Sequence, residues 1–139
     1  MRNFICAFVA KPNQKMNNTD KNRLQAFREE RAELNEKTLN AGHLGIKRFF
    51  NMDANTYRDG ALDSKTKELL GLVASSVLRC NDCIDYHLEQ CAKTGSTKEE
   101  ILDAMNVALI VGGSIVIPHL RRAVETIEMI EEEGAFQKQ

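Results

Sequence analysis

The sequence is poor in the residues that build sheets, and it lacks long apolar runs. Among its 139 residues there is no tryptophan, and there are only two tyrosines, six phenylalanines, two prolines and eight glycines. Because the strands of sandwiches and barrels depend on aromatic and β-branched residues, this composition favours helices. No apolar run reaches the roughly 18 residues that a membrane-spanning helix needs. We therefore expect an all-α protein that has no membrane partner.

The chain also lacks an excess of charge of either sign. It has 19 basic and 20 acidic residues and a formal net charge of −1 at pH 7. A nucleic-acid-binding domain normally carries a strongly basic surface, so no nucleic-acid partner is expected. The length is that of one ordinary domain. These properties indicate a single globular domain, which we expect to be cytoplasmic.

Four cysteines are the first informative feature, and by number alone they admit a disulfide framework, a metal site or a redox pair. Three of them, Cys80, Cys83 and Cys91, lie within twelve residues of strongly helical sequence, where bridges would constrain little chain. Cys6 lies in residues 1–16, whose apolar run 4–10 faintly resembles a secretory signal. We interpret residues 1–16 as an N-terminal extension, expect Cys6 to be incidental, and assign residues 17–139 to the helical domain.

Periodicity, capping signals and glycines divide this domain into about six consecutive helices. We predict helices from about residue 19 or 20 to about Asn35 and then over residues 46–52, 65–78, 80–93, 98–111 and from about 114 onward. Thr97 and Glu100 form a T-x-x-E capping box that opens one of them. The segment 107–111 is apolar on all sides, so it is expected to be deeply buried or to lie in a subunit interface. The predicted fold is a single-domain helical bundle.

The chemistry is concentrated in the sequence Cys80-x-x-Cys83-x-x-x-His87. On an ideal helix these three residues and Cys91 share an arc of roughly 80°. A helix N-terminus lowers the pKa of a thiol from its usual value of about 8.5, because the helix dipole stabilises the thiolate. A histidine one turn away can take the thiol proton, and a second thiol can form the disulfide. These are the groups that a thiol peroxidase or a disulfide exchanger needs.

Two other interpretations stay open. One is a zinc-stabilised helical binding module, whose ligands would be Cys80, Cys83 and His87 with one of Cys91, His119 or Glu68. Against it, ligands spaced in this way along one helix spread over about 10 Å of its axis, too far to meet at one ion. The other interpretation treats the cysteines as small core residues and the histidine as a buried polar group.

Glu68 strengthens the redox interpretation. It lies on the preceding predicted helix, twelve residues before Cys80, and antiparallel packing of the two helices lets it face the start of the next one. A carboxylate there can orient His87 and accept its proton. Without such packing, Glu68 is a surface residue paired with Lys65 or Arg79.

Two residues carry weaker signals. His119 lies at the margin of the apolar stripe of the last helix, where it is expected to bind a backbone carbonyl or, alternatively, to lie at the mouth of the pocket. Cys91, one turn past His87, is expected to be a buried thiol and not a third redox group.

The spacing of Glu68, an eleven-residue gap and then Cys80-x-x-Cys83-x-x-x-His87 resembles the signature of the carboxymuconolactone decarboxylase superfamily. Within it, the match is to the alkylhydroperoxidase D-like (AhpD-like) branch, and it covers about Asp63–Glu132. The resemblance implies an all-helical fold that assembles as a homotrimer or homohexamer. It also implies that Glu68 and His87 relay protons to a cysteine that reduces hydroperoxides, with Cys80 and Cys83 as the redox pair.

One residue departs from the family pattern. The best-known members carry a histidine beside the second cysteine, where this chain has Asp82. An acid at this position raises the pKa of a neighbouring thiol and removes one proton carrier. The decarboxylase branch typically lacks the cysteine pair, so the pair argues against lactone chemistry. A non-redox lyase with the same fold is the remaining alternative.

The sequence therefore predicts a peroxiredoxin-type antioxidant oxidoreductase that reduces hydroperoxides or exchanges disulfides. The helix dipole favours Cys80 as the thiol of lower pKa, whereas proximity to His87 favours Cys83. We predict that Cys83 attacks the peroxide and that Cys80 resolves the product. No bound cofactor and no metal are expected, but an external dithiol or a thioredoxin-like protein must reduce the disulfide again.

Overall fold

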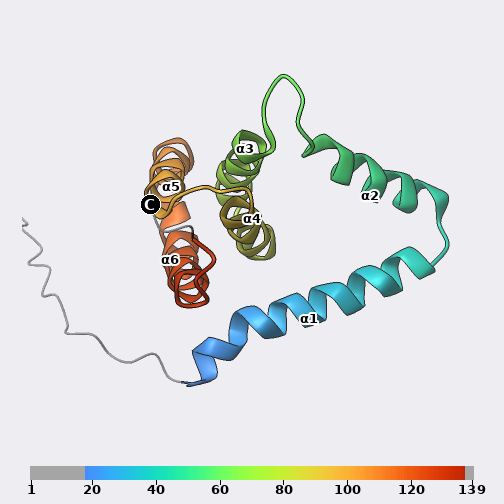
Figure 1. Ribbon diagram of the computed structural model, residues 1–139, viewed down its shortest axis with the longest axis horizontal. Helices are drawn as coiled ribbons and strands as arrows, with labels where there is room; N and C mark the ends of the chain where they lie inside the picture. Colours follow the sequence, from blue (N-terminus) through green and yellow to red (C-terminus); the bar gives the residue numbers. More distant parts are fainter. Residues whose placement is uncertain (1–17, 137–139) are drawn as a thin grey trace, which may run out of the picture.

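The computed structural model describes the backbone of residues 18–136 and the side chains from Arg23 onward. Its elements are α1 (Asn18–Asn40), α2 (Leu44–Thr56), α3 (Ser64–Val77), α4 (Asn81–Lys93), α5 (Lys98–Gly112), the short 3-10 helix η1 (Ser114–Val116) and α6 (Ile117–Glu132) (Figure 1). The prediction of an all-α fold with about six helices is confirmed. The expected extension 1–16 and Cys6 lie outside the described residues.

The first two helices are longer than predicted. The first runs to Asn40 instead of Asn35 because the earliest strong stop signal is Gly42, which adopts a left-handed φ of 84°. The ion pair between Glu33 and Lys37 also supports the added turns. The second helix continues past residue 52 to Thr56, just before the Asp59-Gly60 turn.

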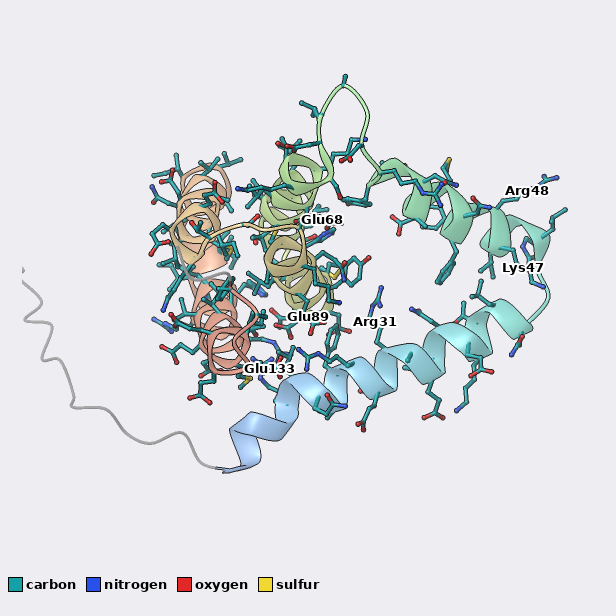
Figure 2. The ribbon with its side chains drawn as sticks, in the orientation of Figure 1. Arg31, Lys47, Arg48, Glu68, Glu89 and Glu133 are labelled. Carbon is teal, nitrogen blue, oxygen red and sulfur yellow. A yellow bond between two sulfur atoms is a disulfide. The ribbon has the colours of Figure 1, made fainter. Side chains whose placement is uncertain are left out.

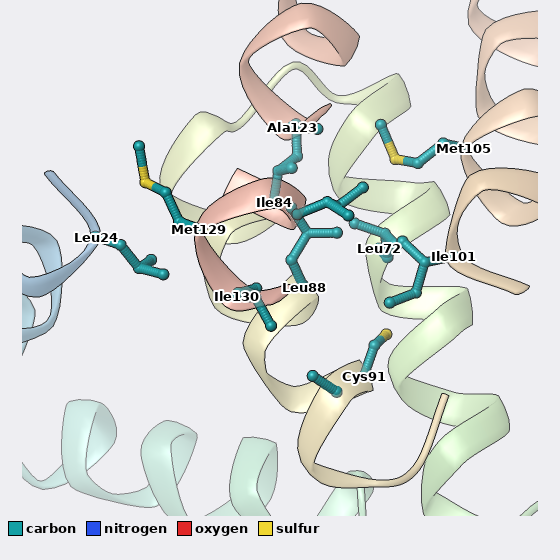
Figure 3. Packing of buried hydrophobic residues seen from close by; sticks show 12 residues of the cluster. Leu24, Leu72, Ile84, Leu88, Cys91, Ile101, Met105, Ala123, Met129 and Ile130 are labelled. Atoms are coloured by element: carbon teal, nitrogen blue, oxygen red, sulfur yellow. The ribbon is translucent and has the colours of Figure 1, made fainter. Parts of the chain in front are cut away.

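Helices α3, α4, α5 and α6 form the bundle that holds the core. Helix α3 packs against both α4 and α5, and α4 packs against α6. The centre of the bundle consists of aliphatic side chains without solvent exposure, among them Leu72, Leu88, Ile101 and Ile130 (Figure 3). Burying each such side chain stabilises the fold by about 1.5–3 kcal/mol. Residues 63–132 therefore contain most of the hydrophobic core.

Capping residues fix where the helices of the bundle begin. Asp63 accepts a hydrogen bond from the backbone N–H of Thr66 at 2.7 Å and starts α3. Thr97 and Glu100 form the predicted capping box at the start of α5. These caps define the start of α3 and α5 within one residue of the predicted positions.

The connection between α3 and α4 is only three residues long. Arg79 has a left-handed φ of 63°, which is uncommon for a residue other than glycine. Its N–H donates to the carbonyl of Ser76, and the N–H of Cys80 donates to the carbonyl of Ser75. This pair of hydrogen bonds is the Schellman arrangement that ends a helix. It places Cys80 directly at the start of α4.

The first two helices form an arm that leaves the bundle (Figure 1). The start of α1 is attached to the bundle through the fully buried Leu24 and through Arg28. Arg28 pairs with Glu89 and Glu133, both of which are labelled in Figure 2. Further along, α1 separates from the bundle, and α2 has no buried residue. Phe49 and Met52 of α2 are more than 60% exposed.

The apolar segment 107–111 is not buried within the chain. Only Ala108 of this segment belongs to the core, whereas Val107, Ile110 and Val111 are exposed. Helix α5 packs on α3 along one side, so its opposite side faces outward. The expectation of deep burial is therefore wrong for the single chain, and the subunit-interface alternative stays a prediction. No helix in the described part of the chain is long and apolar enough to cross a membrane.

Candidate active site

The two cysteines lie at the start of α4 and form a disulfide bond. Cys80 is the N-cap residue and Cys83 the third residue of the helix, with 5.3 Å between their Cα atoms. The sulfur of Cys80 accepts a hydrogen bond from the backbone N–H of Cys83 at 3.3 Å. The prediction that Cys80 shares one face of this helix with Cys83 and His87 is therefore corrected. Cys80 lies just outside the helix, because Arg79 and Cys80 close the preceding Schellman turn. In this position its sulfur faces the free N–H groups of the first helical turn, which stabilise a thiolate.

His87 is held by Glu68, as the antiparallel packing of α3 and α4 predicted. The Nδ1 atom of His87 lies 2.8 Å from the Oε2 atom of Glu68, and the two residues are only 7% and 4% exposed. When the Glu68 carboxylate accepts this hydrogen bond, Nδ1 is the ring atom that donates it. Nε2 is then the atom that can exchange a proton with a neighbour. Glu68 is a buried partner of His87 and not a surface residue paired with Lys65 or Arg79.

Gly71 makes room for the imidazole, a role that the sequence analysis did not identify. A Cβ atom at this position would lie 2.5 Å from Cε1, 2.8 Å from Nε2 and 2.9 Å from Nδ1 of His87. These distances are far below van der Waals contact, so any larger residue displaces the ring. A glycine inside an otherwise regular helix is the signal that could have revealed this position.

Two tyrosines complete the surroundings of His87. The ring centroids of Tyr57 and Tyr86 lie 5.3 and 5.2 Å from the imidazole centroid. Burial raises the pKa of both hydroxyls, so both stay protonated at neutral pH. Arg31 of the arm stacks over the ring of Tyr86 at 4.0 Å (Figure 2). No sequence signal links Tyr57 and Arg31 to the site, because they come from the arm, far from the cysteine motif in sequence.

Cys83 and His87 open into a pocket of about 630 Å³ between the arm and the bundle. The α4 side of this pocket consists of Asp82, Cys83, Tyr86 and His87. Residues of α1, α2 and α6, together with Tyr57 just after α2, form the remaining walls. Cys80 is not among the described residues that line it, so Cys83 is the cysteine that faces the pocket. Asp82 also lines the pocket, which places the departure from the family pattern next to the site.

The other predicted residues have structural roles. Cys91 is completely buried in the core, and burial raises the pKa of its thiol to about 12, so it is unreactive at neutral pH. His119 lies 2.7 Å from the side-chain oxygen of Asn81, through its Nδ1 atom. His119 therefore contacts the side chain of Asn81, the first residue of α4, instead of the expected backbone carbonyl. It is not among the described residues that line the pocket. In the described part of the chain, no three His, Cys, Asp or Glu side chains are grouped as metal ligands.

Comparisons with known proteins agree with this geometry. The sequence profile of the carboxymuconolactone decarboxylase family matches residues 46–126. A crystal structure from Thermotoga maritima is 60% identical with a TM-score of 0.78, over 79% of this chain and 96% of that one. A second T. maritima crystal structure is 56% identical with a TM-score of 0.74, over 82% of this chain and 99% of that one. Its description names it as a carboxymuconolactone decarboxylase family protein and suggests that it is involved in an antioxidative response.

A more distant structure has the same fold. The chain is 28% identical to a carboxymuconolactone decarboxylase family protein from Legionella pneumophila, with a TM-score of 0.68 over 80% of this chain and 96% of that one. The family resemblance expected from the spacing of Glu68, the cysteine pair and His87 is confirmed by these matches. The chain belongs to the carboxymuconolactone decarboxylase family.

Proposed function

We propose that this protein is a thiol-dependent peroxidase of the AhpD-like branch, which reduces hydroperoxides through Cys83 and Cys80. The observation that carries the proposal is the arrangement of Cys83 and His87 one turn apart in a single pocket, with Glu68 bound to the far side of the imidazole. A thiol, a proton acceptor and an orienting carboxylate are the groups of an activated nucleophile. The description of a T. maritima relative in terms of an antioxidative response supports the same reaction class.

The reaction begins at Cys83. In the reduced protein His87 takes the thiol proton, and the thiolate attacks the terminal peroxide oxygen. The O–O bond breaks, the sulfur becomes a sulfenic acid, and the departing alkoxide receives the proton from His87 and leaves as an alcohol. Glu68 stabilises the imidazolium that exists between the two proton transfers.

Cys80 then resolves the sulfenic acid. Its thiolate attacks the sulfur of Cys83, the S–O bond breaks, and hydroxide leaves as water after taking one proton. The N-cap position suits this role, because the N–H of Cys83 already donates to the Cys80 sulfur. An external dithiol or a thioredoxin-like protein then reduces the disulfide by two electrons and returns both thiols. We place this cycle in the cytoplasm and in a homotrimer or homohexamer.

Single-cysteine variants test the proposal. Wild type should consume organic hydroperoxide with a dithiol donor, whereas Cys83→Ser and Cys80→Ser should not turn over. After one addition of peroxide, dimedone should trap a sulfenic acid on Cys83 in the Cys80→Ser variant. Cys91→Ala is the matched control, because its thiol is buried away from the pocket. Trapping in Cys83→Ser but not in Cys80→Ser would reverse the roles, and a lack of peroxide consumption by wild type with every dithiol would reject the peroxidase.

A further inference from the structure

A buried ionic cluster lies at one end of the pocket, and the proposed reaction does not use it. Asp85 of α4 is completely buried and accepts hydrogen bonds from Arg23 at 3.0 Å, from Arg122 at 2.8 Å and from the hydroxyl of Thr126 at 2.6 Å. Arg23 also donates to that hydroxyl at 2.7 Å. Both arginines line the same pocket as Cys83. We call this group the basic end of the pocket.

The charges of the basic end do not cancel. Two guanidinium groups share the single carboxylate of Asp85, which leaves an excess of one positive charge. The side chains of Arg23 and Arg122 are only 23% and 35% exposed, so water screens this excess poorly. The Nε atoms of both arginines are buried without a hydrogen-bond partner among the described residues, which adds to the cost of holding two cations here. A second anion in the pocket would lower that cost.

The other charged groups of the pocket do not remove this excess. Glu30, Asp53 and Asp82 also line it, but all three residues are exposed. Their charges are solvated by water and screened by salt more strongly than those of the partly buried arginines of the cluster. Arg31 is exposed as well and stacks on Tyr86.

Apolar side chains of α1 extend from the basic end along the pocket. Ala26, Phe27 and Leu34 lie on this wall. The pocket thus combines a hydrocarbon-binding wall, a fixed positive charge and a reactive cysteine, in a volume of about 630 Å³ that suits an organic molecule far larger than hydrogen peroxide.

We propose that Arg23 and Arg122 select an organic hydroperoxide that carries a carboxylate on a hydrocarbon chain. The carboxylate binds at the outer face of the two guanidinium groups, and the chain lies along Ala26, Phe27 and Leu34. The peroxide then reaches Cys83. This inference rests on the proposed peroxidase function and adds the class of substrate to it.

Linoleic acid hydroperoxide and its methyl ester are suitable probes, because they differ only in the charge of the carboxyl group. For wild type, kcat/KM for the acid should exceed that for the ester by about tenfold, the effect of one charge-assisted hydrogen bond. Arg122→Gln should abolish this preference, and Arg122→Lys, which keeps the charge, should retain part of it. Arg121→Gln is the matched control: it removes an exposed arginine of the same helix that does not line the pocket, so its preference should equal that of wild type. Added salt should reduce the wild-type preference.

The failure of this inference can be told apart from failure of the proposed function. Equal turnover of acid and ester by wild type overturns the charge selection and leaves the peroxidase in place. If neither probe is turned over, calorimetric binding of linoleic acid and methyl linoleate decides instead, since neither contains a peroxide. Binding of the acid about tenfold more tightly supports the basic end as a carboxylate site, and equal affinities overturn it. Should Arg122→Gln not fold, the salt dependence of wild type and the ratio in Arg122→Lys remain as tests.

Discussion

Substitution of Gly71 by alanine is expected to damage the site while leaving the fold intact. The added Cβ atom would lie 2.5 Å from Cε1 of His87. The imidazole must therefore move by about 1 Å to restore an ordinary contact of about 3.5 Å. Glu68 holds Nδ1 of the same ring through the 2.8 Å hydrogen bond, so this shift breaks the alignment of the relay. A displacement of that size costs about 100-fold in rate.

The effect of Gly71→Ala on stability should be small by comparison. Alanine in place of glycine favours a helix by about 1 kcal/mol, whereas overpacking against a buried ring costs about 1–3 kcal/mol. We expect the free energy of unfolding to fall by no more than about 2 kcal/mol, which urea denaturation measures. The activity measurement is kcat/KM for an organic hydroperoxide with a saturating dithiol. Ala74→Gly, at an exposed position of the same helix, should lower stability by about 1 kcal/mol without loss of kcat/KM.

A double-mutant cycle with His87 makes the cause of the loss explicit. If Gly71→Ala acts through the imidazole, then it should lower activity no further in a His87→Ala background, and there it should stabilise the helix. Wild-type turnover by the Gly71→Ala variant would refute the reasoning, because the ring then tolerates a displacement that the geometry forbids. An equal further loss in the His87→Ala background would also refute it.

Three other predictions follow from the same structure. Glu68→Gln keeps a hydrogen-bond partner for His87 but not its charge, so kcat/KM for peroxide should fall by about 100-fold, and an unchanged rate across the pH profile would exclude the relay. Arg79→Gly removes the cost of a left-handed non-glycine residue, and the free energy of unfolding in urea should rise by about 0.5–1 kcal/mol, whereas a decrease would contradict the strain at this turn. The pKa of Cys91 is raised by burial from 9.0 to about 12, so the folded state favours the neutral thiol. The contribution of Cys91 to stability should be complete below pH 9 and be lost as the pH rises from 9 toward 12, so Cys91→Ala should make the decline in stability over this range less steep.

Much of the fold and the centre of the site could be predicted from the sequence, because their signals are local. The capping box at Thr97 and the cap at Asp63 lie within single turns, so they identify the helix starts. The pairing of Glu68 with His87 follows from two adjacent antiparallel helices with a short connection. The last helical turns of α1 were not predicted because residues 36–40 are largely polar and provide no periodicity to follow, although they contain neither glycine nor proline.

The remaining features depend on packing between segments distant in sequence. The role of Gly71 depends on the orientation of α4, which places the His87 ring against this glycine. Arg23 meets Asp85 across 62 residues, and no local pattern could have joined them. The position of Cys80 outside the helix follows from the left-handed Arg79, a conformation that sequence rules assign to glycine or asparagine. The exposure of Val107 and its neighbours likewise depends on which side of α5 meets α3.

The hairpin of α3 and α4 separates reactivity from recognition within this molecule. All four residues assigned to the proposed chemistry lie between residues 64 and 93, on two helices and the three-residue connection between them. Most of the surface that meets a substrate comes instead from α1, α2 and α6. Mutations in the arm can therefore change which molecule is accepted without moving a single reacting atom. Under the proposed function, substitutions in α1 and α2 would therefore alter the walls of the pocket while leaving the hairpin that carries the cysteines, Glu68 and His87 unchanged.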